Sequence, residues 1–444
     1  MSDRLLIRGG RVIDPATGID ARLDVLVEDG SVARMHAAIE PEGARVLDAT
    51  GCVVAPGFID LHTHLREPGF EYKEDIRSGT AAAASGGFTT VCAMPNTEPA
   101  IDTRSVVEQV LRQAAAAGTV RVLPIGAVTR GRRGEELAEL GELAEAGCVA
   151  FSDDGAPVAD ATLLRRALEY ANAFGLPVID HCEDPSLVRG GVMHEGWVAT
   201  RLGLRGVPAA AEAIAVARDV AIAALTGAHL HIAHVSTAAA VDVIREAKSR
   251  SVSVTAEVTP HHLTLTDETV AFGALDGDAL IYDTNAKVNP PLRSRDDVEA
   301  CVRALAEGTI DCIATDHAPH AIIEKLCEFD DAAFGISGLE TAFGLSMRLV
   351  ESGALTLPSL IERMTIAPAR ALQLDRVVPA IGTLAAGAPA DLVVLDPDAL
   401  WIVDPARFAS RGQNTPLAGV TLRGLVRATV AAGHIVHELE AAHA

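Results

Sequence analysis

Apolar and polar positions along the chain alternate with two different periods. Between residues 52 and 315, short apolar runs alternate with longer amphipathic runs that are rich in Ala and Leu. The apolar runs predict strands at 52–60, 87–94, 121–128, 148–152, 176–180, 229–235, 252–258 and 310–315. The amphipathic runs predict helices at 105–118, 135–147, 159–174, 209–225 and 296–307. Eight strands with helical crossovers indicate an α/β fold, a (β/α)8 TIM-like barrel.

The two ends of the chain carry a different pattern, short β-type runs separated by tight turns. Near the N-terminus, Gly9-Gly10 and Asp29-Gly30 each separate two such runs and predict hairpins, because these residues supply positive φ angles. Comparable runs occur near the C-terminus at 390–395, 420–422, 426–430 and 434–436. Neither end has enough strands to bury a core alone. The sequence therefore predicts a small β domain formed from residues 1–52 and 386–444, beside a barrel domain at 53–385.

Motif content, charge and cysteine positions argue against one rival fold and against several classes of binding partner. No G-x-G-x-x-G motif follows a strand, which disfavours the rival doubly wound sheet. The net charge of −23 argues against nucleic acid and anionic membranes as partners. No 18-residue uncharged apolar run and no signal peptide are present. The seven cysteines include no C-x-x-C pair and most lie in apolar runs, so a cytoplasmic protein is expected.

Several of the predicted barrel strands end in metal-ligand residues. His62 and His64 are two positions apart at the end of the first strand, so they can face the same ion. His181 and His234 each end a later strand, and Asp316 ends the eighth. Parallel barrel strands deliver their last residues to one face, where these side chains meet. A carboxylate beside a metal-bound water can both bind the metal and carry a proton, which makes Asp316 the predicted acid/base.

A site with two cations needs an anion between them, and the fourth strand is where it is expected. Two neighbouring divalent ions repel strongly unless an anion bridges them. None of the four lysines lies on this strand, so a modified lysine cannot serve. Asp153 and Asp154 follow the strand and point in opposite directions. Spacing alone leaves open which of the two carboxylates bridges the ions.

Three further residues suggest an anionic substrate. Arg66 follows the two histidines, and a guanidinium beside metal ions is costly unless an anionic ligand joins it. Asn96 and Asn289 lie in loops after strands, where their amides can hold a carboxylate or a ring imide. A turn-forming role for each Asn is an equally good interpretation of its position.

Taken together, these motifs resemble the dihydroorotases of the amidohydrolase superfamily, in the type with an aspartate bridge. The matching segments span nearly the whole chain: 60–69, 94–97, 151–155, 181–183, 234–237, 257–262, 287–293, 316–320 and 334–341. The resemblance implies a reversible cyclisation of N-carbamoyl-L-aspartate to L-dihydroorotate in pyrimidine synthesis. It also brings a homodimer and a complex with aspartate carbamoyltransferase into consideration.

The resemblance implies specific roles by position. His62, His64 and Asp316 would bind one zinc ion, His181 and His234 the other, and Asp154 both, giving two Zn2+ per subunit. The substrate would be held by His64, Arg66, Asn96, Asn289 and His320, with backbone groups near Phe334 and Gly335. The residues 318–337 have no clear period and are predicted to form an active-site loop. Ile322 and Ile323 depart from the more polar residues that are common there in this family.

Two other classes of function compete with this interpretation. The nearest is another cyclic-amide hydrolase, a hydantoinase or allantoinase, which usually carries the modified lysine that this chain lacks. The second is an inactive scaffold for aspartate carbamoyltransferase. A scaffold is expected to lose metal ligands, and this chain retains all six.

Overall fold

The barrel predicted from the sequence is present in the computed structural model, which describes residues 4–275 and 280–439. Neighbouring strands pair in parallel in the order β15-β14-β13-β10-β9-β8-β7-β6. The ring is closed between its first and last strands, where His64 N donates to His317 O at 2.9 Å. The strands are β6 (Phe58–Thr63), β7 (Phe88–Ala93), β8 (Arg121–Gly126), β9 (Ala150–Ser152), β10 (Val178–Asp180), β13 (Leu230–Ile232), β14 (Val254–Val258) and β15 (Cys312–Ile313).

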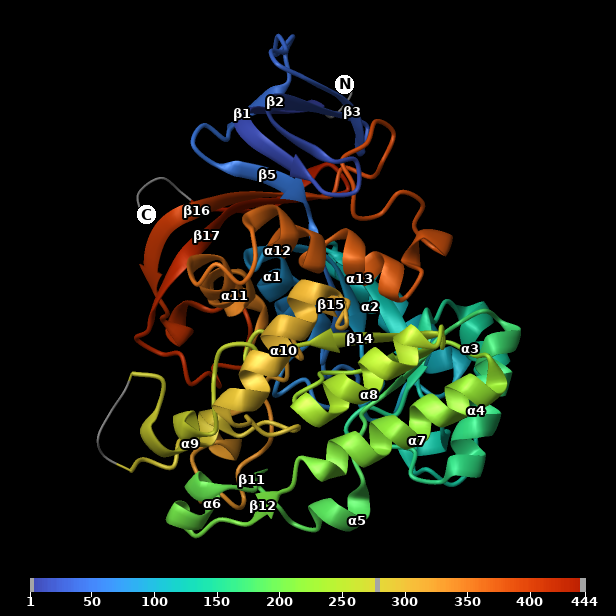
Figure 1. Cartoon of the computed structure of the whole chain (residues 1–444). Coiled ribbons are helices and arrows are strands. Elements are labelled where there is room, and N and C mark those ends of the chain that lie inside the picture. The colour runs from blue at the N-terminus through green and yellow to red at the C-terminus, as the bar shows by residue number, and fades with distance from the viewer. Residues whose placement is uncertain (1–3, 276–279, 440–444) are drawn as a thin grey trace.

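Helices cover the outside of the barrel (Figure 1). They are α1 (Ile76–Ser85), α2 (Arg104–Ala117), α3 (Leu140–Ala146), α4 (Ala161–Ala173), α7 (Ala210–Thr226), α8 (Ala238–Ser249), α10 (Arg295–Glu307), α11 (Ala342–Glu351), α12 (Leu357–Met364) and α13 (Ile366–Ala371). Asp160 caps α4 and Ser294 caps α10 through backbone N–H groups, as expected for these residue types. The predicted helix 135–147 is shorter than expected, because Ala138 N donates to Val128 O and holds the preceding segment extended.

Shorter elements surround the mouth of the barrel. They are α5 (Pro185–Val188), α6 (Trp197–Leu202) and α9 (Glu268–Phe272), together with the two-stranded ribbon of β11 (Met193–His194) and β12 (Gly206–Val207). They lie together at the lower end of the molecule in Figure 1, away from the small sheet.

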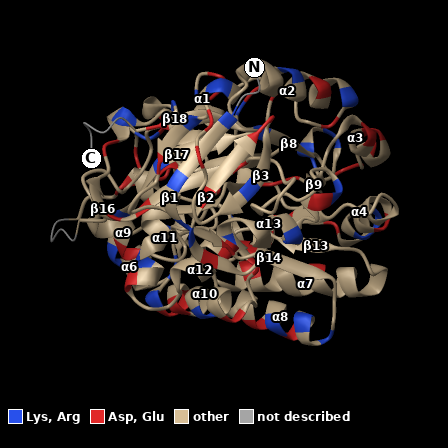
Figure 2. Ribbon diagram, turned by 90° about the horizontal axis from the view of Figure 1, so that it is seen from above, with Lys and Arg blue, Asp and Glu red and all other residues tan. Residues whose placement is uncertain are grey.

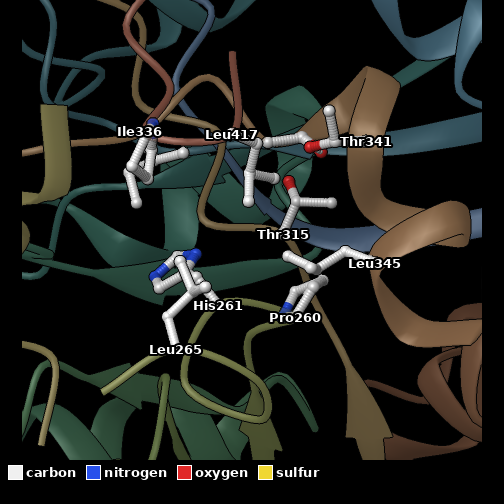
Figure 3. Close-up of a pocket in the computed structure, with 10 residues that line it drawn as sticks. Pro260, His261, Leu265, Thr315, Ile336, Thr341, Leu345 and Leu417 are labelled. Atoms are coloured by element: carbon white, nitrogen blue, oxygen red, sulfur yellow. Dashed lines mark hydrogen bonds between the residues drawn. The ribbon is translucent and has the colours of Figure 1, made fainter. Parts of the chain in front are cut away.

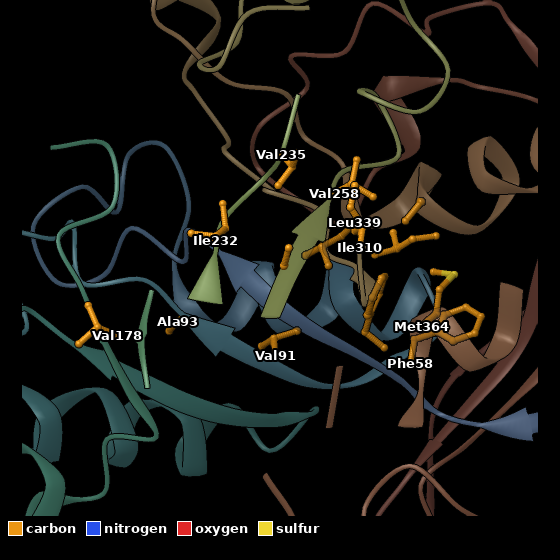
Figure 4. Close-up of a cluster of buried hydrophobic side chains, with 14 of the residues drawn as sticks. Phe58, Val91, Ala93, Val178, Ile232, Val235, Val258, Ile310, Leu339 and Met364 are labelled. Carbon is orange, nitrogen blue, oxygen red and sulfur yellow. The ribbon is translucent and has the colours of Figure 1, made fainter. Parts of the chain in front are cut away.

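The apolar core has two layers separated by the barrel wall. One layer packs strand residues such as Phe58, Val91 and Val258 against the helices (Figure 4). The other fills the barrel interior with Ile59, Leu61 and their neighbours and includes residues of α13. Aliphatic residues on both faces of the strands explain the continuous apolar runs in the sequence.

The small β domain also forms as predicted, by pairing of the two ends of the chain. Its order is β18-β17-β16-β5-β1-β2-β3, with β4 beside β1. The pairing of β16 with β5 joins the two ends, which lie together at the top of Figure 1. The strands are β1 (Arg4–Asp14), β2 (Ile19–Glu28), β3 (Ser31–His36), β4 (Arg45–Asp48), β5 (Val53–Pro56), β16 (Leu392–Ile402), β17 (Thr421–Ala431) and β18 (His434–Glu438).

Three local predictions in this region are wrong. The chain at Gly9-Gly10 makes no hairpin but a bulge within β1, where the pairing register shifts. The run 52–60 is two strands, since β5 belongs to the small sheet and β6 to the barrel. The runs at 420–422 and 426–430 form the single strand β17. The domain boundaries stay a prediction, although β5 joins the small sheet from beyond residue 52.

The outer surface carries both signs of charge. On α8, Arg245 Nη1 lies 2.6 Å from Asp242 Oδ1. Acidic and basic residues are interspersed over the outer helices (Figure 2). Within residues 4–275 and 280–439, no helix is both long and apolar enough to cross a membrane.

Candidate metal centre and substrate site

Six buried side chains from five barrel strands meet at one end of the barrel. His62, His64 and Asp316 each place one ligand atom within 4.8 Å of the others, and so do His62, Asp154 and His234. The remaining predicted ligand, His181, places Nδ1 2.8 Å from His234 Nε2. His234 and Asp316 have φ angles of 34° and 47°, so the chain turns sharply where it leaves β13 and β15. The structure therefore brings together all six side chains predicted as ligands; their role as ligands stays a prediction.

Hydrogen bonds outside the cluster fix the tautomers of two of the rings. His62 Nδ1 donates to Glu257 Oε1 at 2.7 Å, and His64 Nδ1 donates to Asn96 Oδ1 at 2.7 Å. Both Nε2 atoms then face carboxylates, at 3.4 Å from Asp154 Oδ1 and 3.0 Å from Asp316 Oδ1. With a divalent cation bound among them, the Nε2 lone pairs and the carboxylate oxygens would serve as its ligands.

Unpartnered atoms support the same interpretation. His62 Nε2 and Asp154 Oδ1 are buried and make no hydrogen bond within the described residues. A buried polar atom without a partner is unusual and calls for an ion or a water. The donor set of imidazole nitrogens and carboxylate oxygens suits zinc and related divalent ions. These residues therefore fit a metal cofactor.

The two neighbouring aspartates after β9 point in different directions. Asp153 accepts from the backbone N–H of Val128 at 2.9 Å and of Thr129 at 3.1 Å, and from the Thr129 hydroxyl. Asp154 instead lies 3.4 to 3.5 Å from ring nitrogens of all four histidines. Burial alone would raise the pKa of Asp154, but His62 and the other rings more than reverse this and hold it well below its ordinary value. Of these two aspartates, Asp154 is the one whose carboxylate lies against the histidine cluster.

Glu257, on β14, is an important residue of the site to which the sequence assigned no role. Its carboxylate is fully buried and accepts from His62 Nδ1 and, at 3.2 Å, from His231 Nε2. Burial alone would raise its pKa, but His62 and His231 more than offset this and lower the pKa to about 2. Glu257 therefore stays ionised and holds the His62 ring with Nε2 toward the cluster.

Glu257→Gln should weaken metal binding, measured with zinc, because the amide cannot accept from both histidines. We expect a loss of roughly 10- to 100-fold in affinity, as for other groups that orient a metal ligand. Competition with a chelator measures it. Glu246→Gln is the matched control, since Glu246 is exposed on α8. Equal zinc affinities of the Glu257 variant and the parent protein would contradict this role.

Other histidines near the site serve as supports. His231 lies inside the barrel, where Nδ1 is 2.8 Å from Thr255 Oγ1 and Nε2 donates to Glu257. His262 Nε2 donates to Pro290 O at 3.0 Å and so holds the segment after Asn289. His261 and Leu265 border a small, mostly apolar pocket (Figure 3). Burial lowers the pKa of His261 to about 4.

Arg66 and His320 lie side by side next to the metal cluster. Arg66 Nη2 is 3.3 Å from His320 Nε2, and Arg66 Nε donates to Pro319 O at 3.2 Å. Burial lowers the pKa of Arg66 to about 10, so the guanidinium stays charged at neutral pH. Burial and Arg66 lower the pKa of His320 to about 3, so the ring is neutral. A buried guanidinium beside a neutral imidazole is suited to an anionic ligand.

Asn96 and Asn289 contact two of the histidines predicted as metal ligands. Asn96 accepts from His64, and Asn289 Nδ2 donates to His181 Nε2 at 3.0 Å. Each amide uses one of its two polar ends in this contact. Both residues are partly exposed, so the remaining end can meet a ligand. The role of both asparagines in substrate binding stays a prediction. The structure indicates a second role, because each amide also orients a histidine ring.

The predicted active-site loop folds over this end of the barrel. Apart from the short 3-10 turn at Ile322–Glu324 it has no regular structure. Lys325 is buried and donates to Ala333 O at 2.6 Å and Thr284 O at 3.0 Å, which ties the loop to the segment before Asn289. Phe334 is exposed near the loop's end, with Lys287 Nζ 4.4 Å from its ring centroid. Ile322 and Ile323 point to solvent.

A (β/α)8 barrel with His and Asp side chains converging at the ends of its strands defines a class, the metal-dependent hydrolases of the amidohydrolase type. A family model described as Dihydro-orotase-like matches residues 51–240, and one described as Amidohydrolase family matches residues 200–437. The chain belongs to the dihydroorotase family of amidohydrolases.

Relatives named dihydroorotase are similar over their full length. The one from Anaeromyxobacter sp. (strain K) is 58% identical over 439 residues, 99% of each chain. The one from Geobacter metallireducens is 53% identical and covers 98% of this chain and 99% of its own. Among solved structures, the L-hydantoinase (dihydropyrimidinase) from Arthrobacter aurescens has a TM-score of 0.85 at 27% identity, covering 99% of this chain and 96% of its own. The dihydropyrimidinase from Brevibacillus agri, at 24% identity and a TM-score of 0.83, shares the fold.

Proposed function

We propose that this chain is a zinc-dependent dihydroorotase, which interconverts N-carbamoyl-L-aspartate and L-dihydroorotate in pyrimidine synthesis. The observation that carries the proposal is a buried, charged Arg66 next to the cluster of Asp154 and the four histidines. In a chain of net charge −23, a buried cation at this place suits a substrate carboxylate. The full-length relatives named dihydroorotase support the same reaction.

The proposed metal arrangement uses the residues that converge at the barrel mouth. His62, His64 and Asp316 would hold one zinc ion, His181 and His234 would hold a second, and Asp154 lies where its carboxylate would serve both. When bound, zinc ions polarise an amide carbonyl and lower the pKa of water. Glu257, Asn96 and Asn289 keep three of the rings in orientation for this role.

The proposed chemistry of the side chains follows from their charge. Burial alone would raise the pKa of Asp316, but His62 and His64 hold it below its ordinary value, so a carboxylate is available to accept a proton. In the hydrolytic direction water adds to the ring amide carbonyl, and Asp316 accepts the proton that the water loses. Asp316 then delivers this proton to the ring nitrogen as the C–N bond breaks, and ring closure runs the same steps in reverse. Arg66, Asn96, Asn289 and His320 hold the substrate, with backbone groups of Phe334 and Gly335 against the ring.

The location of the reaction and the partners of the protein belong to the same proposal. The reaction takes place in the cytoplasm, in keeping with seven free cysteines of which five are buried. Partners are a small anionic substrate, a second copy of the chain and aspartate carbamoyltransferase. Oligomeric state and co-purification with the transferase test the last two.

The rival cyclic amides provide the decisive assay. Hydrolysis of dihydroorotate is followed by absorbance, beside hydantoin and allantoin, with the zinc-loaded protein. We expect turnover of dihydroorotate alone. Turnover of hydantoin or allantoin without dihydroorotate would replace the proposal with the rival hydrolase. Full zinc loading without turnover of any of the three would favour the scaffold.

Arg66→Ala should raise KM by an amount that corresponds to roughly 2–5 kcal/mol, because a buried carboxylate loses its charged partner. Arg66→Lys keeps the charge without the planar fork and should recover only part of the loss. Arg77→Ala, on the exposed side of α1, is the matched control. An unchanged KM in Arg66→Ala would exclude the contact. Steady-state kinetics at constant zinc gives the answer.

A further inference from the structure

A buried asparagine outside the barrel is bonded to both ends of the active-site loop. Asn414 lies between β16 and β17 and is 4% exposed. Its Nδ2 donates to Ala318 O at 3.0 Å and to Gly335 O at 2.9 Å. Its Oδ1 accepts from His320 N and from the Ser337 hydroxyl, both at 2.9 Å. The amide therefore uses its full capacity of two donors and two acceptor lone pairs.

Two of the four partners of Asn414, His320 and Gly335, belong to the residues assigned to the substrate. Ala318 and His320 come shortly after Asp316, whereas Gly335 and Ser337 come shortly after Phe334. The two loop ends are in close contact, since a Cβ added at Gly335 would lie 2.6 Å from Ala318 O and 3.2 Å from the His320 ring. His320 Nε2 also lies 2.8 Å from Phe334 O. The bonds of Asn414 hold these two ends in register.

The segment that carries Asn414 also has anchors outside the loop. Ser410 donates its hydroxyl to Glu74, and Arg411 N donates to Glu74 Oε1 at 3.1 Å. The fully buried Glu74 also accepts from His317 Nε2 at 3.4 Å. Asn414 is therefore held from outside the loop as well as by the loop, where Ser337 N donates to its backbone O at 2.8 Å.

We propose that Asn414 is a positioning residue for the substrate: it holds His320 and the Phe334–Gly335 backbone in the arrangement that binds the substrate. A segment within the C-terminal part of the β domain thereby completes the site on the barrel. The inference rests on the proposed function for the roles of His320, Phe334 and Gly335. Asn414 touches neither metal ligand side chains nor the proposed acid/base in the contacts described above, so its effect is on substrate binding.

Asn414→Asp provides the kinetic test, because it preserves size and removes both donors. The new carboxylate faces the carbonyl oxygens of Ala318 and Gly335, which repels the two loop ends. We expect KM for dihydroorotate to rise roughly 10- to 100-fold, with kcat within about threefold and zinc content unchanged. Asn172→Asp, on the exposed side of α4, adds the same charge and should leave KM unchanged.

Hydrogen exchange gives a readout that needs no substrate. In Asn414→Ala, which adds no charge, His320 N–H loses its acceptor, so amides of residues 318–337 should exchange roughly 10-fold faster than in the parent protein. This experiment also serves if Asn414→Asp does not fold. Unchanged exchange in Asn414→Ala, or an unchanged KM in folded Asn414→Asp, would overturn the proposal. If the parent protein has no dihydroorotase activity and Asn414→Ala still exchanges faster than the parent, the proposed function is refuted. The role of Asn414 in holding residues 318–337 is then kept.

Discussion

Replacing Asp154 with alanine is expected to empty the metal centre and to abolish turnover. Its carboxylate lies 3.4 to 3.5 Å from the ring nitrogens of four buried histidines, so its charge is shared by both proposed zinc ions. Removing one partner from a buried charged cluster costs about 3–5 kcal/mol. That corresponds to a loss of roughly 100- to 5000-fold in zinc affinity. Metal analysis after dialysis should find less than one zinc ion per chain.

Asp153→Ala is the matched control for this prediction. The Asp153 side chain accepts from Val128 N and Thr129 N, away from the histidines, so its loss should lower the free energy of unfolding by about 1–3 kcal/mol. Zinc content should stay near that of the parent protein. The reverse result, with metal lost from Asp153→Ala and retained in Asp154→Ala, would move the bridge to Asp153.

The sequence was sufficient to predict the barrel and the convergence of the six side chains proposed as metal ligands, because both depend on short-range pattern. Each ligand follows a run of apolar residues, and parallel strands bring their last residues to one face whatever lies between them. The choice between Asp153 and Asp154 could not be made from spacing. It depends on the loop at Thr129, where the backbone N–H donates to the Asp153 carboxylate and holds it away from the histidines.

The supports of the site could not be predicted, because their contacts join distant parts of the chain. Glu257 is 195 residues from His62, and Asn414 is 94 residues from His320. Alternation along β13 does not extend to His234, because the strand ends at Ile232 and the chain then turns to bring His234 into the cluster. A strand's parity holds only while the strand continues.

The errors in the small domain have a similar origin. Gly9 has a φ of 78°, which agrees with a hairpin turn and equally with a bulge in a continuous strand. The local residues are compatible with both conformations. The bulge forms because β1 pairs along its length with β2 on one side and with β4 and β5 on the other.

Asp316→Asn is expected to leave the protein folded and nearly inactive. The amide keeps the size of the carboxylate but cannot take up a proton, and it is a weaker metal ligand. Loss of general acid/base catalysis lowers rates by roughly 10²–10⁴-fold. We therefore expect kcat to fall by at least this amount in both directions of the reaction. Substrate affinity should change little, because Arg66 and His320 remain in place.

Metal content separates the two contributions of Asp316. With zinc in excess, the variant should still bind metal through His62, His64 and Asp154, so that the remaining defect reports proton transfer. The parent enzyme is the reference for the slope of log kcat against pH on the acidic side, which follows ionisation of the general base. That slope should disappear in Asp316→Asn. A fully loaded variant that retains more than about a tenth of the parent kcat would assign the proton transfer to another group.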